Sequence, residues 1–105
     1  MLDIGVVYYR IRPEGDIIDA IWHSTRQPEK LTGTGIAHGD TSNGFPGDYS
    51  ITYFDPNRSE TAKFHLKIVQ DGPTYKLSYI QNGEVLLMGV GIETADGLAA
   101  GYRKL

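Results

Sequence analysis

Residues 70–103 read QDGPTYKLSYIQNGEVLLMGVGIETADGLAAGYR and contain three sequences typical of turns. Asn82-Gly83 favours a two-residue type I′ hairpin turn, because both of its residues tolerate a positive φ. The Ala95–Gly97 segment suits a three-residue loop with Gly97 left-handed, and Gln70–Pro73 suits a four-residue loop. Apolar and polar residues alternate between these turns, which predicts antiparallel strands joined in sequence.

Counting outward from Asn82-Gly83 places Tyr79 opposite Leu86, and side chains then alternate between two faces. A slip of one residue would bury lysines and expose leucines, so the register is tightly specified. Extending the count through all three turns predicts an inner face made of Phe64, Leu66, Ile68, Tyr75, Leu77, Tyr79, Leu86, Met88, Val90, Ile92, Leu98, Ala100 and Tyr102. The predicted outer face carries Lys63, His65, Lys67, Lys76, Ser78, Ile80, Val85, Leu87, Gly89, Gly91, Gly101 and Arg103.

The first half of the chain predicts further strands. Residues 4–12 and 16–24 alternate well enough to form a hairpin around Glu14-Gly15, in which Arg10 would lie opposite Asp19 as an exposed cross-strand ion pair. The expected core residues of this hairpin are Val7, Tyr9, Ile11, Ile18, Ala20 and Trp22. Residues 31–38 and 49–54 add two more strands. The total of about eight strands with short connections predicts an all-β, eight-stranded antiparallel up-and-down barrel.

This pattern resembles the group of barrels formed by the lipocalins, avidin and streptavidin, and the small bacterial calycin-type barrels similar to them. The likeness consists of the strand count, the Gly-Asp and Asn-Gly turns, and core aromatics such as Trp22, Tyr75 and Tyr102. It covers most of the chain. The resemblance implies the fold and a general binding role.

Length and composition limit the classes of protein to consider. The chain has 105 residues, which fits one domain over residues 1–105, and it has no cysteine. Ten basic and thirteen acidic side chains give a net charge of −3, which weighs against nucleic acid as the main partner. No stretch has the ~20 apolar residues of a membrane helix. We therefore expect a cytoplasmic protein without a cofactor and without a membrane partner.

Two groups of residues are candidates for a ligand site. Several aromatic side chains converge inside the predicted barrel, and a buried phenol needs a hydrogen-bond partner, which a ligand can supply. The Gly39–Asp48 loop offers backbone N–H groups and short polar side chains at a barrel mouth, as a lid over a hydroxylated or anionic ligand, although such residues often only satisfy their own turns. The candidate ligand-binding residues are Trp22, Tyr49, Tyr53, Tyr75, Tyr79, Tyr102, Asp40, Thr41, Ser42 and Asn43.

The outer face offers a different kind of site. Lys63, His65, Lys67, Lys76 and Arg103 form a basic surface for an acidic partner or anion, with Lys67 and Lys76 directly opposite each other. A separate apolar spot, made of Ile80, Val85 and Leu87, predicts a homodimer contact. Lone lysines and scattered apolar residues are also ordinary surface features.

Catalytic and metal-binding signatures are weak in this sequence. His23, His38 and His65 have no known ligand spacing, and a metal site usually needs three or four ligands. The five serines lack a recognisable nucleophile context. Two hypotheses remain: a small molecule binds in an aromatic barrel interior, or a barrel with a filled interior acts through its outer surface as an interaction or regulatory module.

Overall fold

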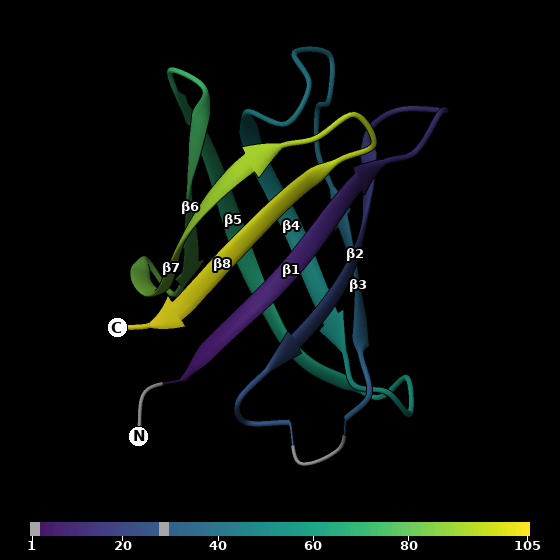
Figure 1. Cartoon of the computed structure of the whole chain (residues 1–105), viewed down its shortest axis with the longest axis vertical. Coiled ribbons are helices and arrows are strands. Elements are labelled where there is room, and N and C mark those ends of the chain that lie inside the picture. Colours follow the sequence, from purple (N-terminus) through teal and green to yellow (C-terminus); the bar gives the residue numbers. More distant parts are fainter. Residues whose placement is uncertain (1–2, 28–29) are drawn as a thin grey trace.

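The computed structural model describes residues 3–27 and 30–105, and these form a closed barrel of eight antiparallel strands (Figure 1). Each strand pairs with its neighbours in the chain, and the first pairs with the last. The strands are β1 (Ile4–Ile11), β2 (Ile17–Ser24), β3 (Gly33–His38), β4 (Gly47–Phe54), β5 (Glu60–Asp71), β6 (Thr74–Gln81), β7 (Glu84–Glu93) and β8 (Leu98–Lys104). The predicted all-β meander barrel is confirmed, and its architecture is compatible with the calycin type.

The β1–β2 hairpin has the predicted register, with Arg10 opposite Asp19. Asp19 pairs with Arg12, however, and not with Arg10 as expected. The Arg12 guanidinium makes a bidentate contact with the Asp19 carboxylate, with Nε to Oδ2 and Nη2 to Oδ1 both at 2.8 Å. Because Arg12 lies just beyond the end of β1, its guanidinium is free to turn back onto the carboxylate. Its hydrogen bonds are the main reason why the pKa of Asp19 is lowered.

The β5–β6 hairpin keeps the predicted faces but has a tighter turn. Asp71 pairs with Thr74, so the turn has two residues rather than four, and Gly72 has the positive φ (60°) that such a turn requires. The register consequently moves by two residues. Lys67 lies opposite Ser78, so the predicted pairing of Lys67 with Lys76 is wrong.

The β6–β7 hairpin contains the main departure from prediction. The turn itself is as expected, with positive φ at Asn82 (50°) and Gly83 (77°). Two residues later the register shifts, because Ile80 pairs with Val85 while Tyr79 pairs with Leu87. Leu86 is therefore an extra residue in a β-bulge, and every later residue of β7 faces the side opposite to the predicted one.

This bulge corrects a set of predicted positions. Met88, Val90 and Ile92 are 39%, 67% and 58% exposed on the outside instead of buried. Gly89 and Gly91, which we expected outside, are buried, while Leu87 turns from the outer face toward the core. In the next loop, Gly97 does not have the predicted positive φ, since a four-residue loop is closed by a hydrogen bond from Thr94 N–H to Gly97 O (2.7 Å).

The reversal of β7 has a reason in the volume of the barrel interior, because inward aromatic residues lie across from glycines. Tyr75 pairs with Gly91, and Tyr102 pairs with Gly89 on one side and Gly5 on the other. A Cβ added at Gly89 would lie 2.7 Å from the carbonyl oxygen of Gly101 and 3.3 Å from Cβ of Tyr102. An eight-stranded barrel has room for only a limited set of side chains. Rings on β6 and β8 therefore leave no room for Met88 or Val90 beside them.

The same pairing of ring and glycine occurs on β3. Gly33 lies opposite Trp22, and Gly35 lies opposite Tyr53. The resulting core is closely packed and comprises Val7, Tyr9, Ile18, Ala20, Ala37, Phe45, Tyr49, Ile51, Tyr53, Leu66, Ile68, Tyr75, Leu77, Tyr79, Leu98 and Ala100. Replacing a glycine that supports a ring thus adds volume where no space exists.

We predict opposite effects for two glycine-to-alanine substitutions. Gly33→Ala presses a methyl group against the Trp22 indole and the Phe54 carbonyl oxygen, so it lowers the free energy of unfolding by about 1–3 kcal/mol. Gly101→Ala points outward, with its nearest neighbour, the Gly5 oxygen, at 3.8 Å. It leaves stability unchanged or raises it by about 0.4–1 kcal/mol, because alanine restricts the unfolded chain. Urea unfolding measures both, and equal stability of the two variants would contradict this packing argument.

Candidate functional site

A cavity of about 340 Å³ opens at the end of the barrel where both chain termini lie (Figure 1). Its walls come from β2, β4, β5, β6, β7 and β8. We call this space the mouth cavity. Its lining residues are Asp3, Trp22, Ser24, Arg26, Tyr53, Thr61, Ala62, Phe64, Tyr79, Gln81, Leu86, Leu87, Tyr102 and Lys104.

Five aromatic rings form a connected wall around the mouth cavity. The Trp22 and Phe64 rings meet Tyr53 edge-on at centroid distances of 6.2 Å, and Phe64 meets Tyr79 in the same way at 5.9 Å. Tyr102 completes the series at 5.8 Å from Tyr79. The indole is held in place because its Nε1 donates to the backbone oxygens of Thr34 (2.9 Å) and Phe54 (3.1 Å). Such edge-to-face contacts fix the rings and leave flat apolar surface toward the cavity.

The floor of the mouth cavity is a cluster of buried tyrosine hydroxyls. Tyr9 Oη lies 2.6 Å from Tyr53 Oη and 2.7 Å from Tyr79 Oη. Tyr53 and Tyr79 also share a hydrogen bond with each other, which acts on the pKa of each. The three hydroxyls can therefore satisfy one another, and Tyr53 and Tyr79 border the cavity.

Burial keeps these phenols neutral. It raises the pKa of Tyr9 and of Tyr53 well above the ordinary value and raises the pKa of Tyr79 to about 12. At the rim, burial also raises the pKa of Tyr102 to about 12, with a hydrogen bond from Ser24 acting in the opposite direction. The floor of the cavity is consequently an uncharged hydrogen-bonding surface across the physiological pH range.

The rim of the mouth cavity carries more positive than negative charge among the described residues. Arg26 and Lys104 line it together with a single carboxylate, that of Asp3. The contact between Arg26 Nη1 and Asp3 Oδ2 is 3.9 Å long, and the Arg26 side chain is 68% exposed. A pair of this kind contributes little to stability. The guanidinium thus remains free to contact another anion.

The Gly39–Asp48 loop lies at the opposite end of the barrel and does not cover the mouth cavity (Figure 1). Its polar groups satisfy one another: the Asp40 carboxylate accepts from Ser42 N–H at 2.8 Å, and Thr41 Oγ1 accepts from Asp16 N–H at 2.8 Å. The hydrogen bond from Ser42 also lowers the pKa of Asp40. Asn43 is exposed. The loop is therefore held by ordinary turn chemistry.

Side chains close this second end. Phe45 is 4% exposed and packs into the core, and Tyr49 Oη donates to the Phe45 carbonyl oxygen at 2.8 Å. Tyr75 is buried, and its hydroxyl donates to the Glu93 carboxylate. Of the aromatic residues that the sequence nominated, Trp22, Tyr53, Tyr79 and Tyr102 thus meet around one cavity, while Tyr49 and Tyr75 do not line it.

No family model, curated protein or solved structure matches this chain. Its function is therefore inferred from the geometry of the barrel.

The outer residues that the sequence grouped together are spread over several strands. Lys63, His65 and Ile80 border a shallow hollow of about 490 Å³ over β4, β5 and β6. His65 Nε2 lies 2.7 Å from Asp48 Oδ1, so a carboxylate accompanies this part of the basic surface. Lys67 and Lys76 lie on β5 and β6, and Arg103 lies on β8 beside Met88. Of the three residues of the expected apolar spot, Leu87 lines the mouth cavity instead, and Ile80 and Val85 remain on the outer face.

Two kinds of feature are absent from residues 3–27 and 30–105. No group of three or more His, Asp or Glu side chains there is arranged to hold a metal ion. Within the same residues, no helix has the length and apolarity that crossing a membrane takes.

Sequence reasoning missed several parts of the mouth cavity. Phe64 was expected in the core, and its parity with Tyr79 was a usable signal that both belong to one site. Tyr9 was likewise placed inside but not recognised as the centre of a hydroxyl cluster. Nothing in the strand pattern signalled Asp3, Arg26 or Lys104, because they lie at strand ends, where side-chain direction depends on the path of the loop.

The raised pKa values predict a loss of stability at alkaline pH. Between about pH 10 and 12 the unfolded chain releases phenolic protons that the folded core retains, so the free energy of unfolding falls as pH rises. Each such tyrosine contributes at most about 1.4 kcal/mol per pH unit. Urea unfolding across this range, with tyrosinate absorbance followed in parallel, measures the effect, and Tyr9→Phe should give a shallower fall. Reversible ionisation of all tyrosines near pH 10 in the folded protein would contradict it.

Proposed function

We propose that this protein binds a small, flat, mainly apolar molecule with one anionic group in the mouth cavity, without catalysing a reaction on it. The observation that carries the proposal is the combination of an aromatic wall, a neutral hydroxyl cluster at the floor and a cationic rim in one cavity. Each of these three features specifies a part of the ligand.

The size and the wall specify the apolar part of the ligand. A volume of about 340 Å³ lies at the small end of the range of about 300–1,000 Å³ typical of ligand pockets. Trp22 and Tyr53 stand edge to face, so a ring inserted beside them finds both a ring face and a ring edge to contact. A flat molecule of one or two fused rings suits this wall.

The polar groups specify how the ligand is oriented. The hydroxyls of Tyr53 and Tyr79 at the floor bond to each other and to Tyr9, so they favour an uncharged inner end of the ligand that needs no polar group. Arg26 and Lys104 at the rim favour a carboxylate or a similar anion at the other end of the molecule. Both ends of the ligand are thereby matched, which fixes its direction in the cavity.

The closest architectural support is the resemblance to lipocalin- and avidin-type barrels, which hold one small molecule inside eight strands. Membership of that group is part of this proposal. The closed end formed by Phe45 and Tyr49 fits it, because a barrel that is blocked at one end receives its ligand through the other.

Binding of 2-naphthoate tests the proposal. At 100 times its dissociation constant a ligand stabilises the folded state by about 2.7 kcal/mol, so we expect an increase in the melting temperature of about 10 °C or more and a change in Trp22 fluorescence. The cationic analogue 2-naphthylmethylamine should give a much smaller shift. Calorimetric melting curves with each compound provide the measurement.

Two variants locate the site. Ala62→Leu fills the mouth cavity next to Tyr53, and it should abolish the effect of 2-naphthoate. Ala99→Leu is the matched control, because it adds the same atoms to the outer face of β8. If 2-naphthoate stabilised the Ala62→Leu variant as strongly as the parent protein, or failed to stabilise the parent protein, the proposal would be wrong.

A further inference from the structure

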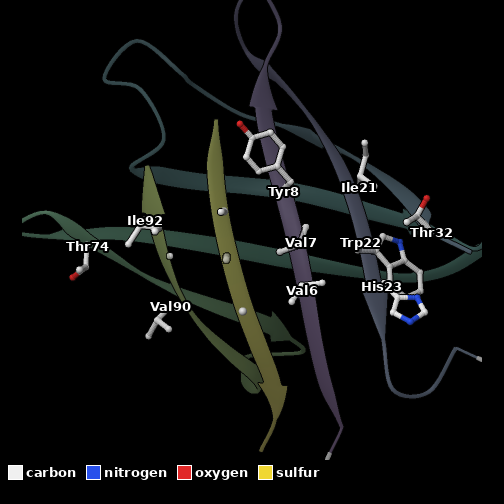
Figure 2. A pocket seen from close by; sticks show the side chains of 14 residues that line it. Val6, Val7, Tyr8, Ile21, Trp22, His23, Thr32, Thr74, Val90 and Ile92 are labelled. Atoms are coloured by element: carbon white, nitrogen blue, oxygen red, sulfur yellow. The ribbon is translucent and has the colours of Figure 1, made fainter. Parts of the chain in front are cut away.

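An apolar groove runs along the outside of the barrel, over β8. Its floor is Ala99 and Gly101, and its sides are Val6 and Tyr8 on β1 and Val90 and Ile92 on β7 (Figure 2). We call it the β8 groove. Val6 lies opposite Gly101 and Tyr8 opposite Ala99, and the β7 residues flank the same two positions from the other side.

The sides of the β8 groove are unusually exposed for aliphatic residues. Val6, Val90 and Ile92 are 60%, 67% and 58% exposed, so none of the described segments of the chain covers them. The groove is part of a surface hollow of about 760 Å³ that continues past β1 to Ile21, His23 and Thr32. The mouth cavity lies inside the barrel and shares Trp22 with this hollow. Contiguous exposed apolar surface of this kind marks an interaction site.

The β8 groove can receive the side chains of an α-helix that rests on its two ridges. Neighbouring strands are about 4.8 Å apart, so the ridge strands β1 and β7 are about 9.6 Å apart from centre to centre. An α-helix with its side chains is about 10–12 Å across, so it spans both ridges. The floor admits side chains from above, because a Cβ at Gly101 would meet only the Gly5 oxygen at 3.8 Å. The apolar side chains of the helix can therefore reach down to Ala99 and Gly101.

The fold argues against other occupants. A closed barrel has no free edge strand, so a partner strand has no ladder to extend. A second copy that docked through the same face would bring its own Arg103 and Lys76 to this surface, and like charges oppose that pairing. The described residues contain no helix, so the proposed occupant is not among them.

Charge around the β8 groove specifies the polar face of that helix. Arg103 lies between Met88 and Ile4 at one end of the groove, and Lys76 lies beside Val90. Neither forms an ion pair with any carboxylate in the part of the chain described. Two unpaired cations beside an apolar surface favour acidic groups on the partner.

We propose that the β8 groove binds an acidic amphipathic helix of a partner protein. The apolar side of the helix contacts Val6, Val90 and Ile92, and carboxylates on its flank reach Arg103 and Lys76. Binding in this way leaves the mouth cavity open, so the barrel can hold a ligand and a partner protein at the same time.

A designed peptide of about 18 residues tests this proposal, since that length gives five helical turns. Leucines recur at i, i+3, i+4 and i+7 on one face, and glutamates occupy the other. One control peptide has lysine in place of every glutamate, and another has the same composition without the apolar stripe. We expect saturable binding of the acidic peptide by fluorescence anisotropy, at least tenfold tighter than either control. Methyl NMR shifts should be confined to Val6, Val90, Ile92 and Ala99.

Protein variants confirm the location. Gly101→Gln fills the floor of the groove, Arg103→Glu reverses the charge, and each should weaken binding at least tenfold without moving the melting temperature by more than a few degrees. Lys67→Glu is the matched charge reversal on β5 and should leave binding unchanged. If Gly101→Gln destabilised the barrel, the Arg103→Glu variant and the NMR map would still show whether the peptide binds in the β8 groove.

Three results would overturn the proposal. They are equal affinity for the acidic and lysine peptides, shifts located away from the β8 groove, and a dimer in sedimentation equilibrium that Gly101→Gln dissociates. The last result would show that a second copy of this chain occupies the β8 groove. The 2-naphthoate response of the Gly101→Gln variant should stay normal, which separates failure of this inference from failure of the ligand proposal.

Discussion

The volume inside an eight-stranded barrel is the constraint on which the other features of this protein depend. Four of the large rings that point inward, those of Trp22, Tyr53, Tyr75 and Tyr102, are offset by glycine at the position directly across the ladder. Trp22 lies over Gly33, Tyr53 over Gly35, and Tyr102 between Gly5 and Gly89. The rings consequently stand in fixed positions at one end of the barrel, where they enclose the mouth cavity instead of filling the axis.

The same constraint separates what the sequence could predict from what it could not. Turn chemistry and alternation were sufficient for the strand count, the β1–β2 register and the faces of β5 and β6, because these depend on local geometry. The orientation of β7 was wrong because its hydrophobic residues favour burial when taken alone. The interior of the barrel already holds Tyr75 and Tyr102, and Gly91 and Gly89 leave room for these two rings where larger residues would not. Strand pairing counted from one turn cannot detect a bulge placed by packing.

Prediction of the candidate site succeeded and failed for related reasons. Inward aromatic residues follow from parity, so Trp22, Tyr53, Tyr79 and Tyr102 were available from the sequence. The Gly39–Asp48 loop attracted attention through its polar composition, but composition does not say at which end of a barrel a loop lies. The order of strands does: an odd-to-even connection after β3 lies with the β1–β2 turn, away from the termini. The residues Asp40 and Thr41 thus belong to the closed end.

A single extra residue connects the two surfaces to which we assign binding. The bulge at Leu86 directs Leu87 toward the mouth cavity and, over the next residues, directs Met88, Val90 and Ile92 outward. Without it, the same aliphatic side chains would crowd the tyrosines, and the outer face of β7 would carry glycines with no ridge beside β8. Bulges persist where they re-aim side chains rather than where they stabilise a ladder. In this barrel, leaving Leu86 unpaired in the ladder places aromatic surface around an open cavity inside and an apolar ridge on the outside.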